Sequence, residues 1–122
     1  MHHFKGLIAP TFTPMDSEGE IDLHPIDRLA ESLLANDISG AYVCGSTGES
    51  VSLTVEERMQ LAGRWQDVAG DRLPIIVHVG HNSLPAAKAL AAHAQKIGAA
   101  AIAAMAPTFF RPVNVEQLVT WC

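Results

Sequence analysis

The sequence predicts an α/β fold in which parallel strands alternate with helices. Short apolar runs rich in β-branched residues alternate along the chain with segments whose apolar residues recur at helical spacing. Glycine and proline residues separate the two kinds of segment. This order implies parallel strands joined by right-handed crossovers. Two architectures fit: a doubly wound open sheet, or part of an eight-stranded β/α barrel. A barrel needs roughly 250 residues, so this chain would hold about half of one.

The first half of the chain predicts two strands around one helix. Residues 5–10 form a short apolar run that ends at proline, as expected of a buried strand. A helix is predicted from residue 26, with Pro25 accepted in its first turn and one apolar face, Ile26, Leu29, Ala30, Leu33 and Leu34. Residues 40–44 predict a second strand, which runs into the tight loop Gly45-Ser-Thr-Gly-Glu49.

The next helix and strand have the clearest signals. Thr54 and Glu57 have the spacing of a capping box, which predicts a helix start, and the buried face would follow at Leu61, Trp65 and Val68. Residues 73–79 form an unbroken apolar run, as in strands buried on both faces.

The end of the chain predicts another helix, a fourth strand and a further helix start. Ser83 would cap a helix that runs to Ile97 and ends at Gly98. The fourth strand, 99–105, is predicted from the alternation because alanine has weak strand propensity. Asn114 would begin the last helix, with a buried face at Leu118, Val119 and Trp121.

Composition excludes several classes of function. The chain has a formal net charge of −5 and only 8 Lys and Arg residues, scattered along it, which argues against a nucleic-acid partner. No apolar run approaches the roughly 20 residues that span a bilayer, and the start of the chain does not resemble a signal peptide. Cys44 and Cys122 lack metal-ligand spacing. We expect a soluble, cytoplasmic protein with no membrane partner and no metal.

Ligands of parallel α/β folds bind beyond the carboxyl ends of the strands. The loops to search are therefore 11–14, 45–50, 80–83 and 106–112. The second is the most suggestive, because its glycines admit close backbone approach while Ser46 and Thr47 offer hydroxyls and amides that could bind a carboxylate. The alternative is a plain strand-to-helix turn in which Ser and Thr cap locally.

For the other candidates a structural role is the simpler expectation. Glu49 could act as an acid or base, but a carboxylate beside a glycine turn more often accepts backbone hydrogen bonds. His78 and His81 are a poor metal pair, and we expect them to be hydrogen-bonded polar residues. Cys44 should be a small buried hydrophobe. The segment 106–112, with two phenylalanines and an arginine, could line a pocket or form a subunit interface.

Three stretches together resemble the N-acetylneuraminate lyase and dihydrodipicolinate synthase family. They are Gly6-Leu-Ile-Ala-Pro-Thr-Phe-Thr-Pro14, Gly45-Ser-Thr-Gly-Glu49 with Ser52-Leu-Thr-Val-Glu-Glu-Arg58, and Ala106-Pro-Thr-Phe-Phe-Arg-Pro112. The match runs nearly end to end, and residues 75–80 with Ser83-Leu84 look closer to the lyases. The resemblance implies a homotetrameric (β/α)8 TIM barrel of class I aldolase type, of which residues 1–122 are the N-terminal half of a single, truncated domain.

The resemblance also implies roles for particular residues. Ser46 and Thr47 match the family's carboxylate-binding pair, and Ser46 matches a hydroxyl of its proton relay. No metal or cofactor is implied. Phe109 stands where the synthases usually have a relay tyrosine that serves a neighbouring subunit; phenylalanine has no hydroxyl, which weakens the synthase assignment.

The family's Schiff-base lysine and catalytic tyrosine match no residue of this chain and would lie beyond Cys122. Lys5 precedes the first strand, and Lys88 and Lys96 fall in a predicted helix, so none lies at the carboxyl end of a strand. Tyr42, within a strand, is expected to pack. Alone, the chain is therefore expected to be inactive.

The expected activity of the parent enzyme is aldol cleavage of a sialic acid to pyruvate and N-acetylmannosamine through a lysine Schiff base. This chain would supply the loop that binds the carboxylate of the small 2-keto acid. One alternative is dihydrodipicolinate synthase or another pyruvate-dependent aldolase of the family. An alternative of another class is a catalytically inactive half-barrel that assembles through its open sheet edges.

Overall fold

The computed structural model describes residues 4–121, and its centre is a four-stranded parallel sheet. The strands lie side by side in chain order: β1 (Ile8–Pro10), β2 (Gly40–Val43), β3 (Ile75–His78) and β4 (Ala101–Ala103). In the two common doubly wound orders the third or the fourth strand is added on the other side of the first strand, whereas a barrel adds every strand on the same side. The order therefore favours the barrel over the open sheet.

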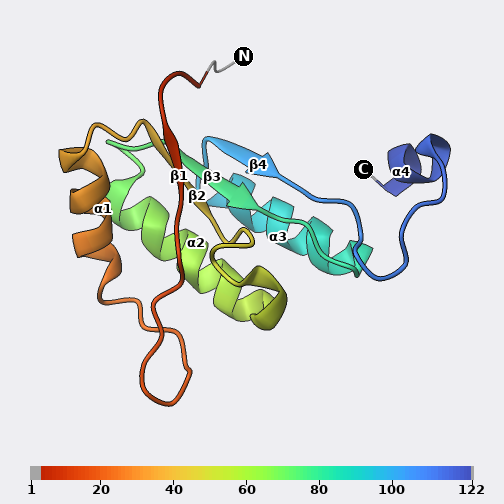
Figure 1. The fold of residues 1–122 in the computed structure, drawn as a ribbon, viewed down its shortest axis with the longest axis horizontal. Helices are drawn as coiled ribbons and strands as arrows, with labels where there is room; N and C mark the ends of the chain where they lie inside the picture. The colour runs from red at the N-terminus through yellow and green to blue at the C-terminus, as the bar shows by residue number, and fades with distance from the viewer. Residues whose placement is uncertain (1–3, 122) are drawn as a thin grey trace.

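Helices connect the strands and cover one face of the sheet. They are α1 (Ile26–Ala35), α2 (Val55–Ala69) and α3 (Leu84–Lys96), and the 3₁₀ turn η1 (Ser50–Ser52) precedes α2. These three helices lie side by side, with α2 in the middle (Figure 1). A last helix, α4 (Val115–Trp121), stands apart from them at the end of the extended segment that follows β4 (Figure 1). Among the described residues no helix is both long and apolar enough to cross a membrane.

The hydrophobic core lies between the sheet and these three helices. Leu61 and Trp65 of α2 are almost fully buried, in agreement with the predicted face, whereas Val68 is half-buried. Alternate strand residues complete the core from the sheet side: Ala41, Val43, Ile75 and Val77. The α2 start is also as predicted, because Thr54 and Glu57 form both hydrogen bonds of a capping box.

The opposite face of the sheet is apolar but uncovered. Tyr42 pairs with Ile76, which pairs in turn with Ala101, and all three are only half-buried. Strand β3 was expected to be buried on both faces; it is buried on the helix side, while the other face would be enclosed only by further strands of a barrel.

Three details differ from the expectations. All four strands are shorter than predicted; β2, for example, stops at Val43 because Cys44 has a left-handed φ of 57° that ends extended pairing. The Ser83 side chain makes no cap hydrogen bond; instead its amide donates to His81 Nδ1 at 2.9 Å. Helix α4 has no buried face, since none of its residues is buried.

Candidate functional site

The carboxyl ends of the four strands bring the predicted loops to one edge of the sheet. The loop after β2 lies against the segment that leaves β1, and the loops after β3 and β4 lie against each other. Ser46 and Thr47 belong to the first of these contacts, and His78, His81 and the segment after Ala103 belong to the second. The candidate site therefore has two neighbouring parts.

The loop 45–49 has a defined backbone between two left-handed residues. Cys44 precedes it and Glu49 ends it, with φ of 57° and 56°. The Glu49 amide donates to Ser46 O at 3.1 Å, and the Ser50 amide donates to Gly45 O at 3.2 Å. The Ser46 and Thr47 side chains are exposed, so both hydroxyls are accessible to a ligand. The predicted carboxylate-binding pair is therefore presented on an ordered turn.

Contacts with the segment after β1 fix this loop from the other side. The Thr13 hydroxyl, which is buried, donates to Gly48 O at 2.7 Å. A Cβ atom added at Gly48 would lie 3.1 Å from the Thr11 carbonyl oxygen and 3.3 Å from the Cys44 backbone. Only glycine allows so close an approach without displacement. Nothing in the sequence singled out Thr13, because its partner is a backbone atom of a loop 35 residues away.

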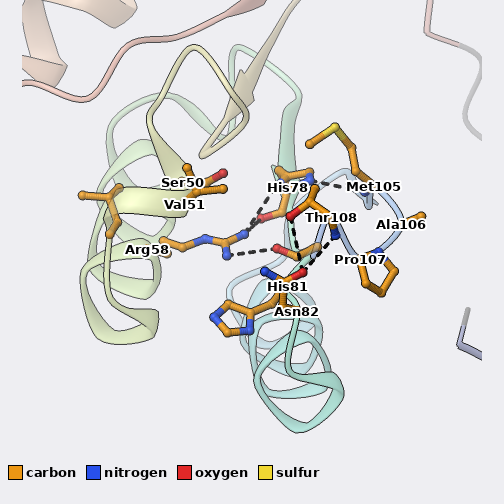
Figure 2. A pocket seen from close by; sticks show the side chains of 12 residues that line it. Ser50, Val51, Arg58, His78, His81, Asn82, Met105, Ala106, Pro107 and Thr108 are labelled. Atoms are coloured by element: carbon orange, nitrogen blue, oxygen red, sulfur yellow. Dashed lines mark hydrogen bonds between the residues drawn. The ribbon is translucent and has the colours of Figure 1, made fainter. Parts of the chain in front are cut away.

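A buried arginine organises the second part of the site. Arg58, on the first turns of α2, has an exposed fraction of 2% and extends toward the end of β3 (Figure 2). Its Nη1 donates to Gly80 O at 3.1 Å, and its Nη2 donates to His78 O at 2.7 Å. These residues line a small cavity of about 90 Å³ together with Ser50, Asn82 and Thr108.

The two ring nitrogens of His78 each face an N–H group, of which a neutral ring can accept only one. Arg58 Nη2 lies 3.3 Å from Nδ1, and the Met105 amide donates to Nε2 at 3.3 Å. Burial lowers the pKa of His78, and the Arg58 charge lowers it further, while a hydrogen bond with the Cys44 backbone acts in the opposite direction. A neutral imidazole accepts at one ring nitrogen and a charged one at neither. The tautomer with its proton on Nδ1 satisfies the Met105 amide.

Asn82 ties the loop after β3 to the loop after β4. Its Oδ1 accepts from the Thr108 amide at 2.9 Å (Figure 2) and also from the Phe109 amide at 3.4 Å. Beyond this contact Phe109 and Phe110 are 78% and 84% exposed and pack edge to face. Pro107 and Thr108 line the cavity, which confirms the pocket prediction for segment 106–112, while the subunit-interface prediction for the two exposed phenylalanines stays a prediction.

The remaining candidates have simple roles or none. Cys44 is buried as predicted, and burial raises the pKa of its thiol to about 11. The Glu49 side chain is exposed, and within residues 4–121 its carboxylate accepts no backbone hydrogen bond, contrary to expectation. Tyr42 packs with its ring centroid 6.2 Å from that of His78. In the same described range no cluster of His, Cys, Asp or Glu could hold a metal.

The three lysines lie away from the site, as their positions in the sequence predicted. Lys5 precedes β1, and Lys88 and Lys96 lie on α3 with exposed side chains. Arg58 is another residue that the sequence analysis missed. Its place in the first turn of α2 was a weak signal, because helical side chains lean toward the helix N-terminus, but its partners on β3 could not be identified from the sequence.

A model of the dihydrodipicolinate synthetase family matches residues 3–121, almost the whole chain. The chain belongs to this family. Among curated members, N-acetylneuraminate lyase A of Xenopus laevis is 44% identical over 119 residues, which cover 96% of this chain and 39% of that protein. N-acetylneuraminate lyase of Danio rerio is 43% identical over 115 residues, or 93% of this chain and 38% of that protein.

Solved structures of N-acetylneuraminate lyases superpose on all or nearly all of the chain. The N-acetylneuraminate lyase (sialic acid aldolase) of Aliivibrio salmonicida has a TM-score of 0.95 and 39% identity, and the match covers 100% of this chain and 41% of that one. The fold is therefore four βα units of a TIM barrel, in the family of these aldolases. The chain spans about two fifths of the length of the relatives it matches.

Proposed function

We propose that this chain is the carboxylate-binding half of an N-acetylneuraminate lyase that cleaves a sialic acid to pyruvate and N-acetylmannosamine. The observation that carries the proposal is the exposed Ser46–Thr47 pair on an ordered loop at the carboxyl edge of the sheet. Identities of 39–44% with N-acetylneuraminate lyases support the substrate class. Residues 1–122 are then half of a single barrel domain.

The two hydroxyls suit the carboxylate of a 2-keto acid. Each can donate a charge-assisted hydrogen bond, worth about 1.5–3 kcal/mol net, and the amides of a tight turn add further donors. Ser46 also holds a proton next to the keto group, which suits a step in a proton relay. Thr13 and Gly48 keep this turn in place, so the donors are oriented before the ligand arrives.

The covalent step belongs to a lysine outside this chain. In a Schiff-base aldolase the lysine amine condenses with the keto carbon and water leaves, which requires a deprotonated amine next to the bound carboxylate. Lys5, Lys88 and Lys96 are exposed and distant from the Ser46 loop in sequence and fold. Alone, the chain binds the keto acid without forming the adduct. The complete enzyme is then a cytoplasmic homotetramer, as in the family it resembles.

Phe109 favours the lyase over the synthase. The exposed position 109 carries a phenyl ring, so this position offers no phenolic hydroxyl to a relay across a subunit contact.

A titration of the ¹⁵N-labelled chain with pyruvate tests the proposal. We expect saturable shifts of the Ser46, Thr47 and Gly48 amides, lost in Ser46→Ala and in Thr47→Val and absent with N-acetylmannosamine, which has no carboxylate. Pyruvate with borohydride should leave the intact mass unchanged. Failure of wild-type chain to shift, or a covalent pyruvyl adduct, would contradict the proposal.

The uncovered inner face of the sheet supports a second candidate function, which is assembly with other chains. Tyr42, Ile76 and Ala101 are half-buried there, and the outer edges of β1 and β4 have no neighbouring strand within the described residues. An inactive half-barrel that assembles through these edges would show the same face. Concentration-dependent association without any pyruvate shift in the amide spectrum would favour this alternative.

A further inference from the structure

Arg58 is a buried cation without an acidic partner. Only 2% of the residue is exposed, and no carboxylate lies within ion-pair distance of it in the part of the chain described, where the ion pairs are Arg64–Asp27 and Arg72–Glu31. Burying a guanidinium is costly unless its donors are satisfied. The guanidinium donates to two backbone carbonyl oxygens, while its buried Nε has no partner among the described residues.

The contacts of Arg58 join the entry of the Ser46 loop and the start of α2 to the next strand. At the loop entry, Cys44 Sγ donates to the Arg58 carbonyl oxygen at 3.7 Å. Beyond the loop and η1, the Arg58 amide donates at 3.1 Å to the carbonyl oxygen of Thr54, the N-cap of α2, in the first helical hydrogen bond of α2. The guanidinium then reaches His78 O and Gly80 O at the end of β3. The contacts to Cys44 and Thr54 use the backbone of residue 58, and those to the end of β3 use its guanidinium, so the side chain ties the start of α2, which holds Cys44 at the loop entry, to the neighbouring strand.

The connection continues to β4 through the His78 ring. Nε2 of His78 accepts from the Met105 amide, just beyond the end of β4. The turn between them is tightly packed, since a Cβ atom at Gly80 would lie 2.9 Å from both His78 Nε2 and Met105 N. A displacement of the guanidinium would therefore be transmitted to the ends of both strands.

We propose that Arg58 is a positioning residue for keto-acid binding, which sets the Ser46–Thr47 loop against the carboxyl ends of β3 and β4. The inference rests on the proposed function and assigns Arg58 no contact with the substrate. The planar guanidinium spans two carbonyl oxygens with two separate donors, whereas a lysine ammonium is a compact point charge on a flexible four-carbon stem. Lysine in this position keeps the charge but cannot hold both carbonyls in the same geometry.

The test compares Arg58→Lys and Arg58→Met with Arg64→Met in the 122-residue chain, well below the melting temperature of each variant. Arg64 is a matched control, because it lies on the same helix in an exposed ion pair 2.6 Å from Asp27. Two quantities are measured by NMR: the dissociation constant for pyruvate, and hydrogen exchange of the Glu49, Ser50 and Met105 amides, which donate to the loop and to His78.

We expect Arg58→Lys to weaken pyruvate binding about tenfold, the loss of one charge-assisted hydrogen bond. Exchange of the three amides should accelerate at least as much, while the Ser39 amide, bonded to Leu7 O at the far end of the sheet, stays unchanged. Arg64→Met should alter neither quantity. Arg58→Met should exceed Arg58→Lys; if it does not fold, Arg58→Lys decides.

A variant Arg58→Lys that only melts earlier, with unchanged affinity and unchanged exchange, overturns the inference, because that is the behaviour of a purely structural residue. If wild-type chain does not bind pyruvate, the proposed function fails, and the exchange measurement still decides whether Arg58 positions the loop.

Discussion

At the scale of single residues, the site depends on polar side chains whose partners are backbone atoms. Thr13 donates to Gly48 O, Arg58 donates to His78 O and Gly80 O, and Asn82 accepts from the Thr108 amide. Because the partner in each contact is a backbone atom, no second residue type in the sequence marks the contact. Ser46 and Thr47 could be predicted from their loop, whereas Thr13, Arg58 and Asn82 could not, because their roles exist only after distant strands are adjacent.

His78 should make stability depend on pH near neutrality. Its pKa is lowered in the folded chain by burial and by Arg58, so the unfolded chain binds the proton first. The free energy of unfolding is then highest above about pH 6.5, the unfolded value, and falls as the pH decreases toward the folded pKa. Urea denaturation at pH 7.5 and pH 5.5 measures the difference, which should shrink in His78→Gln.

The exposed His24 supplies the control for that measurement. His24→Gln should retain the wild-type pH dependence. Equal slopes in His78→Gln and wild type would show that His78 is not the group responsible.

Cys44 should be an unreactive thiol. Burial raises its pKa to about 11, and only the thiolate is nucleophilic. In a Cys122→Ser background, where Cys44 is the remaining cysteine, iodoacetamide at pH 8 should label the chain only as fast as it unfolds. Labelling much faster than unfolding, with the rate of a free thiol, would mean that Cys44 is accessible.

At the scale of elements, α2 was the most predictable part and α4 the least. The capping box and the Leu61–Trp65 face are local signals, and both are present in the structure. The apolar spacing at Leu118 and Val119 is equally local, yet no α4 residue is buried, because a helical stripe specifies a face and not what covers it. The strands were predicted too long, because apolar residues continue past the point where the backbone turns and extended pairing stops, as at Cys44.

The Thr54 cap should contribute measurably to stability. Thr54→Ala removes the acceptor for the Glu57 amide and should lower the free energy of unfolding by about 1 kcal/mol. Thr54→Ser keeps the hydroxyl and should be close to wild type. Chemical denaturation at pH 7 provides the comparison; equal stability of the Ala and Ser variants would show that the cap is not needed.

At the scale of the whole molecule, the undecided question was the architecture. Alternating strands and helices fit an open sheet and a barrel equally, because the difference lies in which strands are neighbours. The strands lie in chain order, which identifies the barrel, and the superposition on a sialic acid aldolase agrees. The same arrangement explains the uncovered inner face, which a barrel encloses only with further strands.

Stability should come from the packed helices and not from α4. Leu90 of α3 is 2% exposed, and Leu90→Ala should cost about 2–5 kcal/mol. Leu118 of α4 is half-buried with no core around it, and Leu118→Ala should cost less than about 1 kcal/mol. Thermal or urea denaturation measures both. A large loss at Leu118 would mean that α4 packs in solution.

The chain-order sheet also has a consequence for biosynthesis. Each strand pairs with the one made just before it, as when Ala41 joins Ile75 and Ile76 joins Ala101. A ribosome releases the amino-terminal part first, and no strand among these four must wait for a partner that has yet to be translated. The sheet can grow by one βα unit at a time as the nascent chain emerges, always at the edge of its newest strand.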